Sequence, residues 1–367
     1  MFNKNLMLPF LNPMKIFHVE GIFDDKIKYP WSLEIQPTNK CNLKCQFCAY
    51  NKRRKRDPTQ LSAKVFDNLI SSIKEMDVKG VYLSGGGEPL LWSPKKKKIS
   101  DYINKLSKIS DIAVITNGIH LTKDNFDVLK NIFYVLFSLF DINFENTKKI
   151  TKITKKDFSV VLNNIEDLVK YKKKIGIKQP FLGIKTVITP QNYENVISIY
   201  NCIKKLNVDY HIFRPAIDFE GFMEPYLTET QYSKLKKQVK LNKKLIDKKY
   251  TNLNELFSCN KFSKNTECWI VKKGLYCCID AKGDVYPCLY YVGNLNYCIG
   301  NIYNKKLQDI WKSKRHKEVI TKLNNLSKKG RCCELCRFKR YNFLIENKHK
   351  IDIFPKGGYK EMHASFI

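Results

Sequence analysis

The chain of 367 residues lacks any long apolar run and has no recognisable secretory signal. No uninterrupted apolar stretch approaches the roughly 20 residues with which a helix crosses a membrane. The opening segment 1–7 is too short and too interrupted for the apolar region of a signal peptide. We see no internal repeats. These absences predict a cytoplasmic protein without a membrane partner.

Acidic side chains are scarce. The chain has 35 Asp and Glu and 66 Lys and Arg, which gives a formal net charge of +31. Such an excess can attract nucleic acid. However, the lysines are spread along the chain among many Asn and Ile residues, no known nucleic-acid-binding motif is evident, and the run 95–98 indicates a solvated loop. We therefore disfavour a nucleic-acid partner, whereas an anionic substrate such as a nucleotide sugar or phosphate ester is compatible with this charge.

Cysteine, by contrast, is abundant, and its 13 residues fall into groups. Cys41, Cys45 and Cys48 lie in the run Cys-Asn-Leu-Lys-Cys-Gln-Phe-Cys, directly after the strand-like segment 31–36. This loop would lie at the C-terminal end of a strand, where α/β barrels carry their chemistry. Thiolates favour soft metals and iron–sulfur clusters. Three thiolates on a four-iron cube leave one iron open to a small molecule.

Five further segments have the apolar character of buried strands and alternate with helical stripes, as a parallel α/β fold requires. The strand-like segments are 81–83, followed by Ser-Gly-Gly-Gly-Glu-Pro; 112–118, which ends in Thr-Asn-Gly; 135–139; 183–189; and 210–215. The helical stripes of apolar residues fall within 61–73, 158–169 and 193–203, and we expect them to pack on the sheet.

The cysteine loop and the ordered strands together resemble the radical S-adenosylmethionine (SAM) enzymes. The resemblance implies a partial (β/α)6 TIM-like barrel with a small C-terminal α+β auxiliary-cluster domain. It also implies SAM as a cofactor and a [4Fe-4S] cluster held by Cys41, Cys45 and Cys48. In the family, reduction by this cluster cleaves SAM to a 5′-deoxyadenosyl radical that abstracts hydrogen from the substrate. One departure concerns segment 146–152, which has lysines where relatives often carry an arginine, so the partner of the SAM carboxylate is not assigned.

The resemblance further implies which residues contact SAM. The Gly-Gly-Glu stretch of the family binds the amino group of SAM, and glycines let the backbone come close to a ligand. The fourth strand meets the ribose or carboxylate, and the fifth lies near the adenine. The predicted contacts are Phe47, Gly86, Gly87, Glu88, Thr116, Asn117, Ser138 and Ile188.

A second cysteine group, between residues 268 and 336, resembles the auxiliary-cluster region of SPASM/twitch radical SAM enzymes. No cysteine follows Cys336, so the twitch form with one auxiliary [4Fe-4S] cluster fits better than the two-cluster form. The predicted ligands are Cys268, Cys288, Cys333 and Cys336. Cys332 is an alternative to Cys333, and Cys277 or Cys278 could join the set. A structural zinc site is the competing interpretation, because four thiolates also suit Zn²⁺.

The composition and the motifs together divide the chain into five parts. The predicted parts are an N-terminal extension at 1–30, a radical SAM core at 31–240, a helical linker at 241–258 that continues the lysine-rich stretch 234–249, an auxiliary-cluster domain at 259–340, and a basic tail at 341–367. We expect the tail to cover the barrel mouth.

The function implied is a radical oxidation of a small, sugar-like or aminocyclitol-like molecule, with the auxiliary cluster accepting an electron and flavodoxin or ferredoxin supplying one. The alternative is a maturase or epimerase that acts on a ribosomally made precursor peptide, although the thirty residues before the first strand are too few for the usual peptide-binding domain. In an epimerase, Cys202, Cys277 or Cys278 could donate the hydrogen atom. A zinc-stabilised binding protein is the alternative from another class. No catalytic acid or base is assigned. The weak candidates are Asp209, His211 and Arg214 near the sixth strand, and Asp280 and Asp284 near the auxiliary cysteines.

Overall fold

The computed structural model describes residues 13–23, 26–48, 50, 57–217, 227–247, 250–251, 253, 267–332, 336–347 and 365–367. Cys333 and Cys259 lie outside these residues. Among the described helices, none has both the length and the apolar character needed to span a bilayer.

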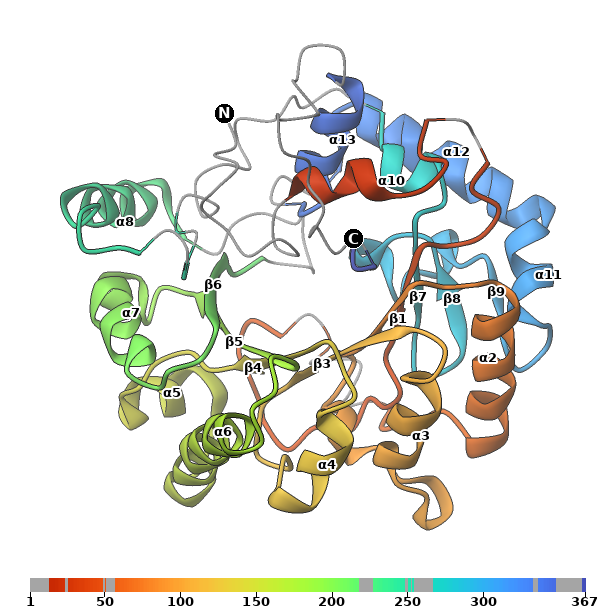
Figure 1. Ribbon diagram of the computed structural model, residues 1–367. Helices are drawn as coiled ribbons and strands as arrows, with labels where there is room; N and C mark the ends of the chain where they lie inside the picture. Colours follow the sequence, from red (N-terminus) through yellow and green to blue (C-terminus); the bar gives the residue numbers. More distant parts are fainter. Residues whose placement is uncertain are drawn as a thin grey trace.

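One curved sheet runs through the described residues in the order β6-β5-β4-β3-β2-β1-β7-β8-β9 (Figure 1). The strands are β1 Ser32–Ile35, β2 Gly80–Leu83, β3 Asp111–Thr116, β4 Tyr134–Ser138, β5 Phe181–Ile188, β6 Tyr210–Pro215, β7 Tyr276–Ile279, β8 Asp284–Tyr286 and β9 Gly300–Asn301. Neighbours from β6 to β7 pair in parallel, and β8 and β9 add antiparallel strands. The predicted fold class, a partial barrel of six parallel strands with a smaller C-terminal part, is confirmed.

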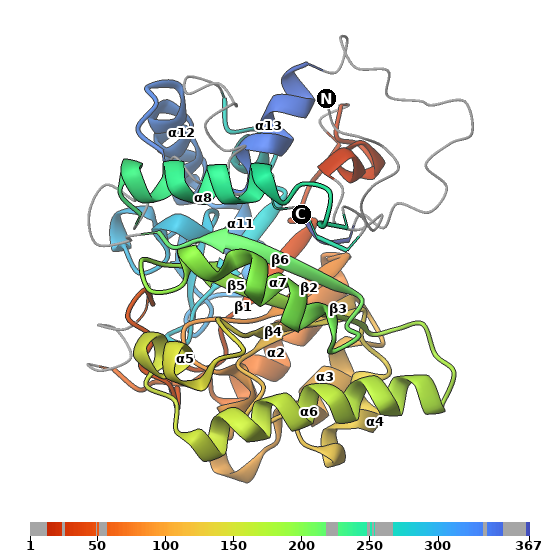
Figure 2. The same ribbon diagram turned by 90° about the vertical axis from the view of Figure 1, so that its left-hand side faces the viewer.

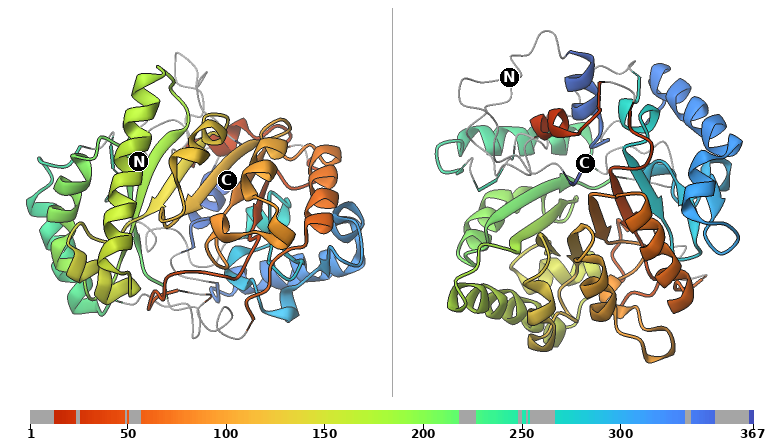
Figure 3. Two further views of the ribbon diagram at one scale, coloured as in Figure 1. Left: turned by 90° about the horizontal axis from the view of Figure 1, so that it is seen from below. Right: turned by 45° about the vertical axis from the view of Figure 1, so that its right-hand side comes forward.

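Helices cover the outer face of the barrel sheet and the C-terminal part (Figures 1 and 3). The helices are α2 Ala63–Glu75, α3 Ile99–Leu106, α4 Phe126–Leu129, α5 Phe144–Thr151, α6 Lys155–Lys174, α7 Val196–Lys204, α8 Glu229–Leu241, α10 Trp269–Lys272, α11 Leu307–Lys312, α12 Lys314–Lys328 and α13 Lys339–Glu346. Short 3-10 turns span Pro13–His18, Pro89–Leu91, Pro94–Lys96, Lys123–Asn125, Tyr193–Asn195, Leu289–Tyr291 and Leu295–Tyr297.

The helices begin where polar caps precede apolar stripes. Ser62 accepts a hydrogen bond from the Val65 amide at the start of α2, and Thr154 caps α6 in the same way through the Asp157 amide. Such caps satisfy amide groups that the helix leaves unpaired. The predicted stripes are buried as expected, although the third begins at Tyr193 in a 3-10 turn before α7.

The strands of the barrel alternate between an apolar outer face and a mixed inner face. Leu33 and Ile35 on β1 are completely buried in the large core beneath the helices, whereas Glu34 between them points the other way. Toward the starts of the strands, the inner face is filled by aromatic rings such as Tyr82 and Tyr134. Aromatic rings therefore fill the barrel at the N-terminal ends of its strands, a cluster called the aromatic floor below. Polar groups such as Glu34 line the interior nearer the C-terminal ends.

The lysine-rich stretch 234–249 is less helical than predicted. Helix α8 begins at Glu229, where Thr228 and Gln231 form a capping box, and it ends at Leu241. Only Leu235 and Val239 of this helix are buried. Without further buried apolar residues, packing does not stabilise the helical conformation past Leu241. Figure 2 shows α8 beside α7, and the Gln238 side chain donates to a main-chain carbonyl of the turn before α7 at 2.7 Å.

The end of the chain does not lie where we expected. The main-chain oxygen of Ser365 approaches Gly80 at the start of β2, and the Ser365 hydroxyl donates to Asp111 at the start of β3, at 2.7 Å. Phe366 is buried among the aromatic rings of the floor, and Ile367 accepts a hydrogen bond from Tyr82. Figure 1 places the C-terminus near the middle of the molecule. The last three residues therefore fill the barrel at the N-terminal ends of its strands, the end opposite the mouth.

Candidate functional site

The three-cysteine loop follows β1 and is hydrogen-bonded to the C-terminal end of helix α5. The Lys44 amide donates to Thr151 at 2.9 Å, and the Gln46 amide donates to Ile150 at 3.0 Å. These bonds use main-chain carbonyls at the end of α5, which have no partner within the helix. All three cysteines are part-exposed, as cluster ligands facing a small molecule must be. The three thiols thus share one loop after β1, called the first thiol site below, and their role as cluster ligands stays a prediction.

The glycine stretch after β2 packs directly against the start of this loop. A Cβ atom on Gly87 would lie 1.9 Å from the Lys40 carbonyl oxygen. The amide of Gly87 donates to Thr38 at 2.7 Å, and the amide of Glu88 donates to Lys40 at 2.8 Å. Gly86 has a positive φ of 82°, which favours glycine. The glycines therefore position the cysteine loop, a role additional to the predicted approach to SAM.

Glu88 is 2% exposed, and its carboxylate is held by donors within the protein. It accepts hydrogen bonds from the Thr116 hydroxyl at 2.7 Å, the Asn117 amide at 2.7 Å and the Leu90 amide at 3.1 Å. Burial outweighs these bonds and raises the pKa of Glu88 to about 7. The Asn117 side chain in turn donates to Asn42 in the cysteine loop at 2.8 Å. The structure thus brings Glu88, Thr116 and Asn117 together beside the loop, and their contacts with SAM stay a prediction.

The remaining predicted SAM contacts occupy different surroundings. Ser138 is part-exposed at the end of β4, and the Phe47 ring lies 5.1 Å from the Phe140 ring in an edge-on arrangement. Ile188 is completely buried in the core behind the sheet. An adenine contact by its side chain would require that core to open, so its main chain is the part available to a ligand at this position.

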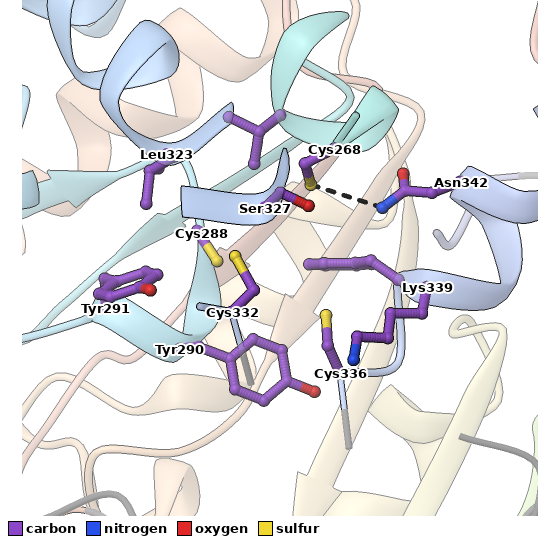
Figure 4. Close-up of a pocket in the computed structure, with 12 residues that line it drawn as sticks. Cys268, Cys288, Tyr290, Tyr291, Leu323, Ser327, Cys332, Cys336, Lys339 and Asn342 are labelled. Carbon is purple, nitrogen blue, oxygen red and sulfur yellow. Dashed lines mark hydrogen bonds between the residues drawn. The ribbon is translucent and has the colours of Figure 1, made fainter. Parts of the chain in front are cut away.

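The second thiol site is a cavity between β8, α10, α12 and α13 (Figure 4). Its lining residues are Cys268, Val271, Cys288, Tyr290, Tyr291, Leu323, Ser327, Cys332, Cys336, Phe338, Lys339 and Asn342. Four cysteines thus share one mostly apolar cavity. Cys332 is among them, and the predicted ligand Cys333 lies outside the described residues. Among the described residues, no three His, Cys, Asp or Glu side chains already form a site for a single metal ion.

The chemistry of this cavity suits soft-metal ligands. Burial raises the pKa of Cys268 to about 11, against the opposing effect of a hydrogen bond from Asn342 to its sulfur at 3.6 Å. Burial likewise raises the pKa of Cys332. A buried thiol of this kind stays protonated unless a metal takes the proton's place. Thiolates in a protected, apolar cavity are the donor set of an iron–sulfur cluster.

The other candidate cysteines lie elsewhere. Cys277 and Cys278 are completely buried on β7 and do not line the cavity, and burial raises the pKa of both thiols. Cys202 is part-buried on α7. None of the three joins either thiol site within the described residues.

The two thiol sites lie at opposite ends of one strand pair. The three-cysteine loop follows the C-terminal end of β1, with which β7 runs parallel. Cys268 precedes the N-terminal end of β7, and Cys288 follows β8, which runs antiparallel to β7. The barrel interior beside β1 therefore lies between the two sites.

Polar side chains fill that interior around Glu34. Its carboxylate accepts hydrogen bonds from Tyr276 at 2.6 Å, Ser84 at 2.7 Å and Gln36 at 3.2 Å. Gln36 also donates to Tyr50, just beyond the cysteine loop, at 2.8 Å. A continuous polar path thus runs from β7 to the neighbourhood of the cysteines.

Three positively charged side chains also lie in or beside the barrel interior, and the sequence analysis did not name two of them. Lys185 and Arg214 stand on β5 and β6, and Arg337 follows Cys336. Only Arg214 was a candidate. The signal was present in the sequence, since charged residues interrupt two otherwise buried strands, where they are rare without a functional reason.

The other weak candidates for acid–base work face away from the interior. His211 is buried on the outer face of β6, where its Nε2 lies 2.8 Å from the Thr186 hydroxyl, and burial lowers its pKa to about 3. Asp209 lies before β6, at the start of the strand, and binds the Leu182 amide and Lys172. Neither residue is placed to exchange a proton with a molecule inside the barrel.

A partial parallel barrel with three thiols on the loop after its first strand, and four more in a separate cavity, defines a cluster-dependent enzyme. A model of the radical SAM superfamily matches residues 35–203. A model of the SPASM iron–sulfur cluster-binding domain matches residues 268–338. The chain belongs to the radical SAM superfamily and carries a SPASM-type auxiliary-cluster domain in its C-terminal part. It is thus a SAM-dependent enzyme with a [4Fe-4S] cluster and additional iron–sulfur binding, and structural zinc is disfavoured.

Two curated relatives illustrate the sequence similarity. The Pyrococcus furiosus tungsten-containing aldehyde ferredoxin oxidoreductase cofactor-modifying protein is 22% identical over 310 residues, which are 77% of this chain and 81% of that protein. The GTP 3′,8-cyclase of Aquifex aeolicus is 29% identical over 192 residues, which are 50% of this chain and 56% of that protein. The second match therefore spans little more than half of the relative.

Two solved structures show the same fold. Streptococcus suis SuiB bound to S-adenosylmethionine has a TM-score of 0.58 and 19% identity, covering 81% of this chain and 69% of that one. Native anSMEcpe with bound AdoMet has a TM-score of 0.61 and 19% identity, covering 88% of this chain and 96% of that one. At these identities the likeness establishes the fold, and the substrate is a separate question.

Proposed function

We propose that this radical SAM enzyme oxidises a small molecule held inside the barrel and that the auxiliary cluster accepts the electron released. The observation that carries the proposal is the arrangement of the two thiol sites at opposite ends of the β1–β7 pair, with a polar interior between them. A substrate beside Glu34 would have one site on either side. That placement suits hydrogen abstraction at one end and electron removal at the other.

The net change in the substrate is the loss of one hydrogen atom, one proton and one electron. When bound, SAM and the two clusters supply the radical that takes the hydrogen atom and the acceptor that takes the electron. The protein's part is to hold the substrate. Glu34, Gln36 and Tyr276 form a fixed hydrogen-bonded wall, and the aromatic floor keeps water out from the starts of the strands.

The curated relatives favour a small molecule. The printed names of the two relatives refer to a cofactor and to GTP, both of which are small molecules rather than proteins. The second relative matches half of this chain, so we take from it the substrate class and not a cyclisation. A sugar-like or aminocyclitol-like substrate with an anionic group is consistent with this class.

A second candidate function is modification of a peptide. Solved structures with the same fold include SuiB bound to the precursor peptide SuiA and anSMEcpe bound to a peptide. Their identities of 19% connect them to this chain through the fold alone. We therefore rank the peptide second.

The test is anaerobic reconstitution with iron and sulfide, followed by dithionite and SAM. We expect about eight irons per chain and release of 5′-deoxyadenosine. Replacing Cys41, Cys45 and Cys48 with alanine should abolish that release. The matched control is Cys202→Ala, which removes a part-buried thiol outside both sites. A protein that takes up zinc and forms no 5′-deoxyadenosine would refute the proposal.

The auxiliary site and the substrate class need separate measurements. The double variant Cys268→Ala/Cys332→Ala should lose about four irons and substrate oxidation, while 5′-deoxyadenosine formation without substrate continues. Adding the small-molecule filtrate of a cell extract should raise the 5′-deoxyadenosine yield, and adding its peptide fraction should not. Stimulation by the peptides instead would favour the second candidate.

A further inference from the structure

Asn342, on helix α13, is a buried polar residue in the wall of the second thiol site, called the auxiliary cavity below. The residue is 3% exposed, and Figure 4 shows its side chain directed toward Cys268. Its Nδ2 atom donates to the Cys268 sulfur at 3.6 Å, and its Oδ1 atom accepts from the Ile270 main-chain amide at 3.1 Å. Both ends of the side chain are therefore hydrogen-bonded, which offsets the cost of taking an amide out of water.

The contact with Ile270 determines which end of the Asn342 side chain faces the sulfur. A main-chain amide can only donate a hydrogen bond, so the group that meets the Ile270 amide must be the carbonyl oxygen. The NH2 group then points at Cys268, because exchanging the two ends would bring N–H groups face to face at Ile270. The direction of the N–H···S bond therefore follows from the way α13 packs against α10.

A hydrogen bond to a cysteine sulfur changes the reduction potential of an iron–sulfur cluster that this sulfur binds. Reduction adds negative charge, and part of that charge lies on the ligating sulfur atoms. A donor at the sulfur therefore stabilises the reduced state more than the oxidised state and raises the potential. Cys268 is a predicted ligand of the auxiliary cluster, so Asn342 lies at a position where a donor has this effect.

Other polar groups of the cavity contact a different cysteine. The Ser327 and Tyr291 hydroxyls form hydrogen bonds with the Cys332 thiol. A hydroxyl can turn to donate or to accept, so its effect on a sulfur depends on its remaining contacts. The Asn342 side chain has no such freedom, because the Ile270 amide holds its oxygen. The structure therefore gives both the position and the direction of the Asn342 hydrogen bond.

We propose that Asn342, through its N–H···S bond to Cys268, raises the reduction potential of the auxiliary cluster and makes it a better electron acceptor. The second half of this inference rests on the proposed function, since electron acceptance is the role proposed above for that cluster. The first half, the raised potential, requires only that the cluster is bound and needs no substrate. Asn342 is thus a positioning residue that acts through Cys268 rather than as a ligand.

A second asparagine, Asn324 on α12, provides a matched control. Its Oδ1 atom accepts from the Cys268 main-chain amide at 2.9 Å. Asn324 and Asn342 therefore each hold one main-chain amide at the start of α10. Of the two, only Asn342 also donates to the Cys268 sulfur. The substitutions Asn324→Leu and Asn342→Leu thus remove comparable main-chain contacts and differ in the N–H···S bond.

The experiment is an anaerobic redox titration of the reconstituted enzyme without substrate, followed by electron paramagnetic resonance. The variant with alanine at Cys41, Cys45 and Cys48 identifies the signal of the auxiliary cluster. We expect Asn342→Leu to lower the ratio of reduced to oxidised auxiliary cluster about tenfold at a given potential. For a one-electron couple this is a fall in midpoint potential of about 59 mV. Asn324→Leu should leave the midpoint potential unchanged, and iron analysis and thermal melting check cluster content and fold in both variants.

A second measurement keeps Asn342 in place and covers the case in which Asn342→Leu loses the cluster. The triple cysteine variant is labelled with asparagine that carries a heavy nitrogen isotope in its side-chain amide. Pulsed electron paramagnetic resonance of its reduced auxiliary cluster should show a hyperfine coupling to that nitrogen, and adding Asn324→Leu should preserve the coupling.

Three results would overturn the proposal. The first is an Asn342→Leu variant that retains the cluster with an unchanged or higher potential. The second is an equal fall in potential in Asn324→Leu, which would mark an effect of the main-chain contacts. The third is a labelled protein without the nitrogen coupling. None of these measurements involves substrate turnover, so their failure is distinct from a failure of the proposed substrate oxidation.

Discussion

At the scale of single residues, the glycine stretch shows how closely two loops of the site depend on each other. Gly85 and Gly87 are separated by one residue but have different surroundings. A Cβ on Gly85 would meet a carbon of the Tyr50 ring at 3.4 Å, an ordinary contact. A Cβ on Gly87 would meet the Lys40 carbonyl oxygen at 1.9 Å, where backbone lies against backbone. Only the second substitution forces the cysteine loop to move.

This difference gives a matched pair of variants. Gly87→Ala should displace the loop before Cys41 and reduce iron retention and 5′-deoxyadenosine formation by roughly a hundredfold, since a shift of about 1 Å at a reacting centre costs that much. Gly85→Ala should keep both close to the level of the unaltered protein. Iron analysis and product quantification after reconstitution provide the measurements. Equal activity of the two variants would show that the loop tolerates displacement.

Glu88 shows what sequence reasoning can and cannot reach at this scale. The Gly-Gly-Glu pattern identified a loop that packs against the cysteine loop, because the glycines and the strand ends are local features. The pattern could not reveal that the carboxylate is occupied by Thr116 and the Asn117 amide, which lie 28 and 29 residues further along the chain. Likewise, the charge of Arg337 lowers the pKa of Lys185, although the two residues are 152 positions apart in sequence. Non-local pairings of this kind have no signature in spacing.

At the scale of elements, the strands were easier to predict than their ends. The expected segments 81–83 and 210–215 match β2 and β6 within one residue, because buried parallel strands form continuous apolar runs. The end of the helix in the lysine-rich stretch 234–249 was harder to predict. Lysines are compatible with a helix, but they do not show at which residue its buried contacts stop. The basic tail was expected at the barrel mouth, whereas its last three residues lie at the opposite end, because the composition of a tail does not show which opening its few apolar residues fill.

The C-terminal residues therefore act as a structural element of the barrel floor. The Phe366 ring lies 5.0 Å from that of Tyr82, 5.2 Å from Tyr134 and 5.6 Å from Phe133. Phe366→Ala should lower the free energy of unfolding by about 3–5 kcal/mol, the cost of a large buried cavity. Denaturant titration measures it. The control is Phe23→Ala, which removes a phenylalanine that is 37% exposed and should change stability by less than about 0.5 kcal/mol. Equal effects of the two substitutions would show that the tail is not part of the folded floor.

At the scale of the whole molecule, the two matched domain models correspond to one continuous sheet. β1 belongs to the barrel, yet its outer edge pairs with β7 of the auxiliary region. The Ser32 amide donates to Leu275 at 3.0 Å, and the Gln36 amide donates to Ile279 at 2.8 Å. Among the residues that the structure describes, the opposite edge, β6, is bridged by Thr251, which pairs with His211. The barrel therefore depends on the auxiliary region to close its first strand.

This dependence predicts that the barrel cannot be separated from the rest of the chain. A fragment of residues 1–258 would expose the main-chain edge of β1 and leave Glu34 without the Tyr276 hydroxyl, a buried acceptor deprived of one donor. We expect this fragment to aggregate or to lack native circular dichroism. Expressing residues 259–367 as a second chain in the same cells should restore solubility, because β7 can pair with β1 without a covalent link. A monomeric, folded fragment that binds iron at the cysteine loop on its own would contradict this account. It would mean that the outer helices and the floor rings other than Phe366 suffice for the barrel, and that β7 serves only to bring the auxiliary cluster to the substrate.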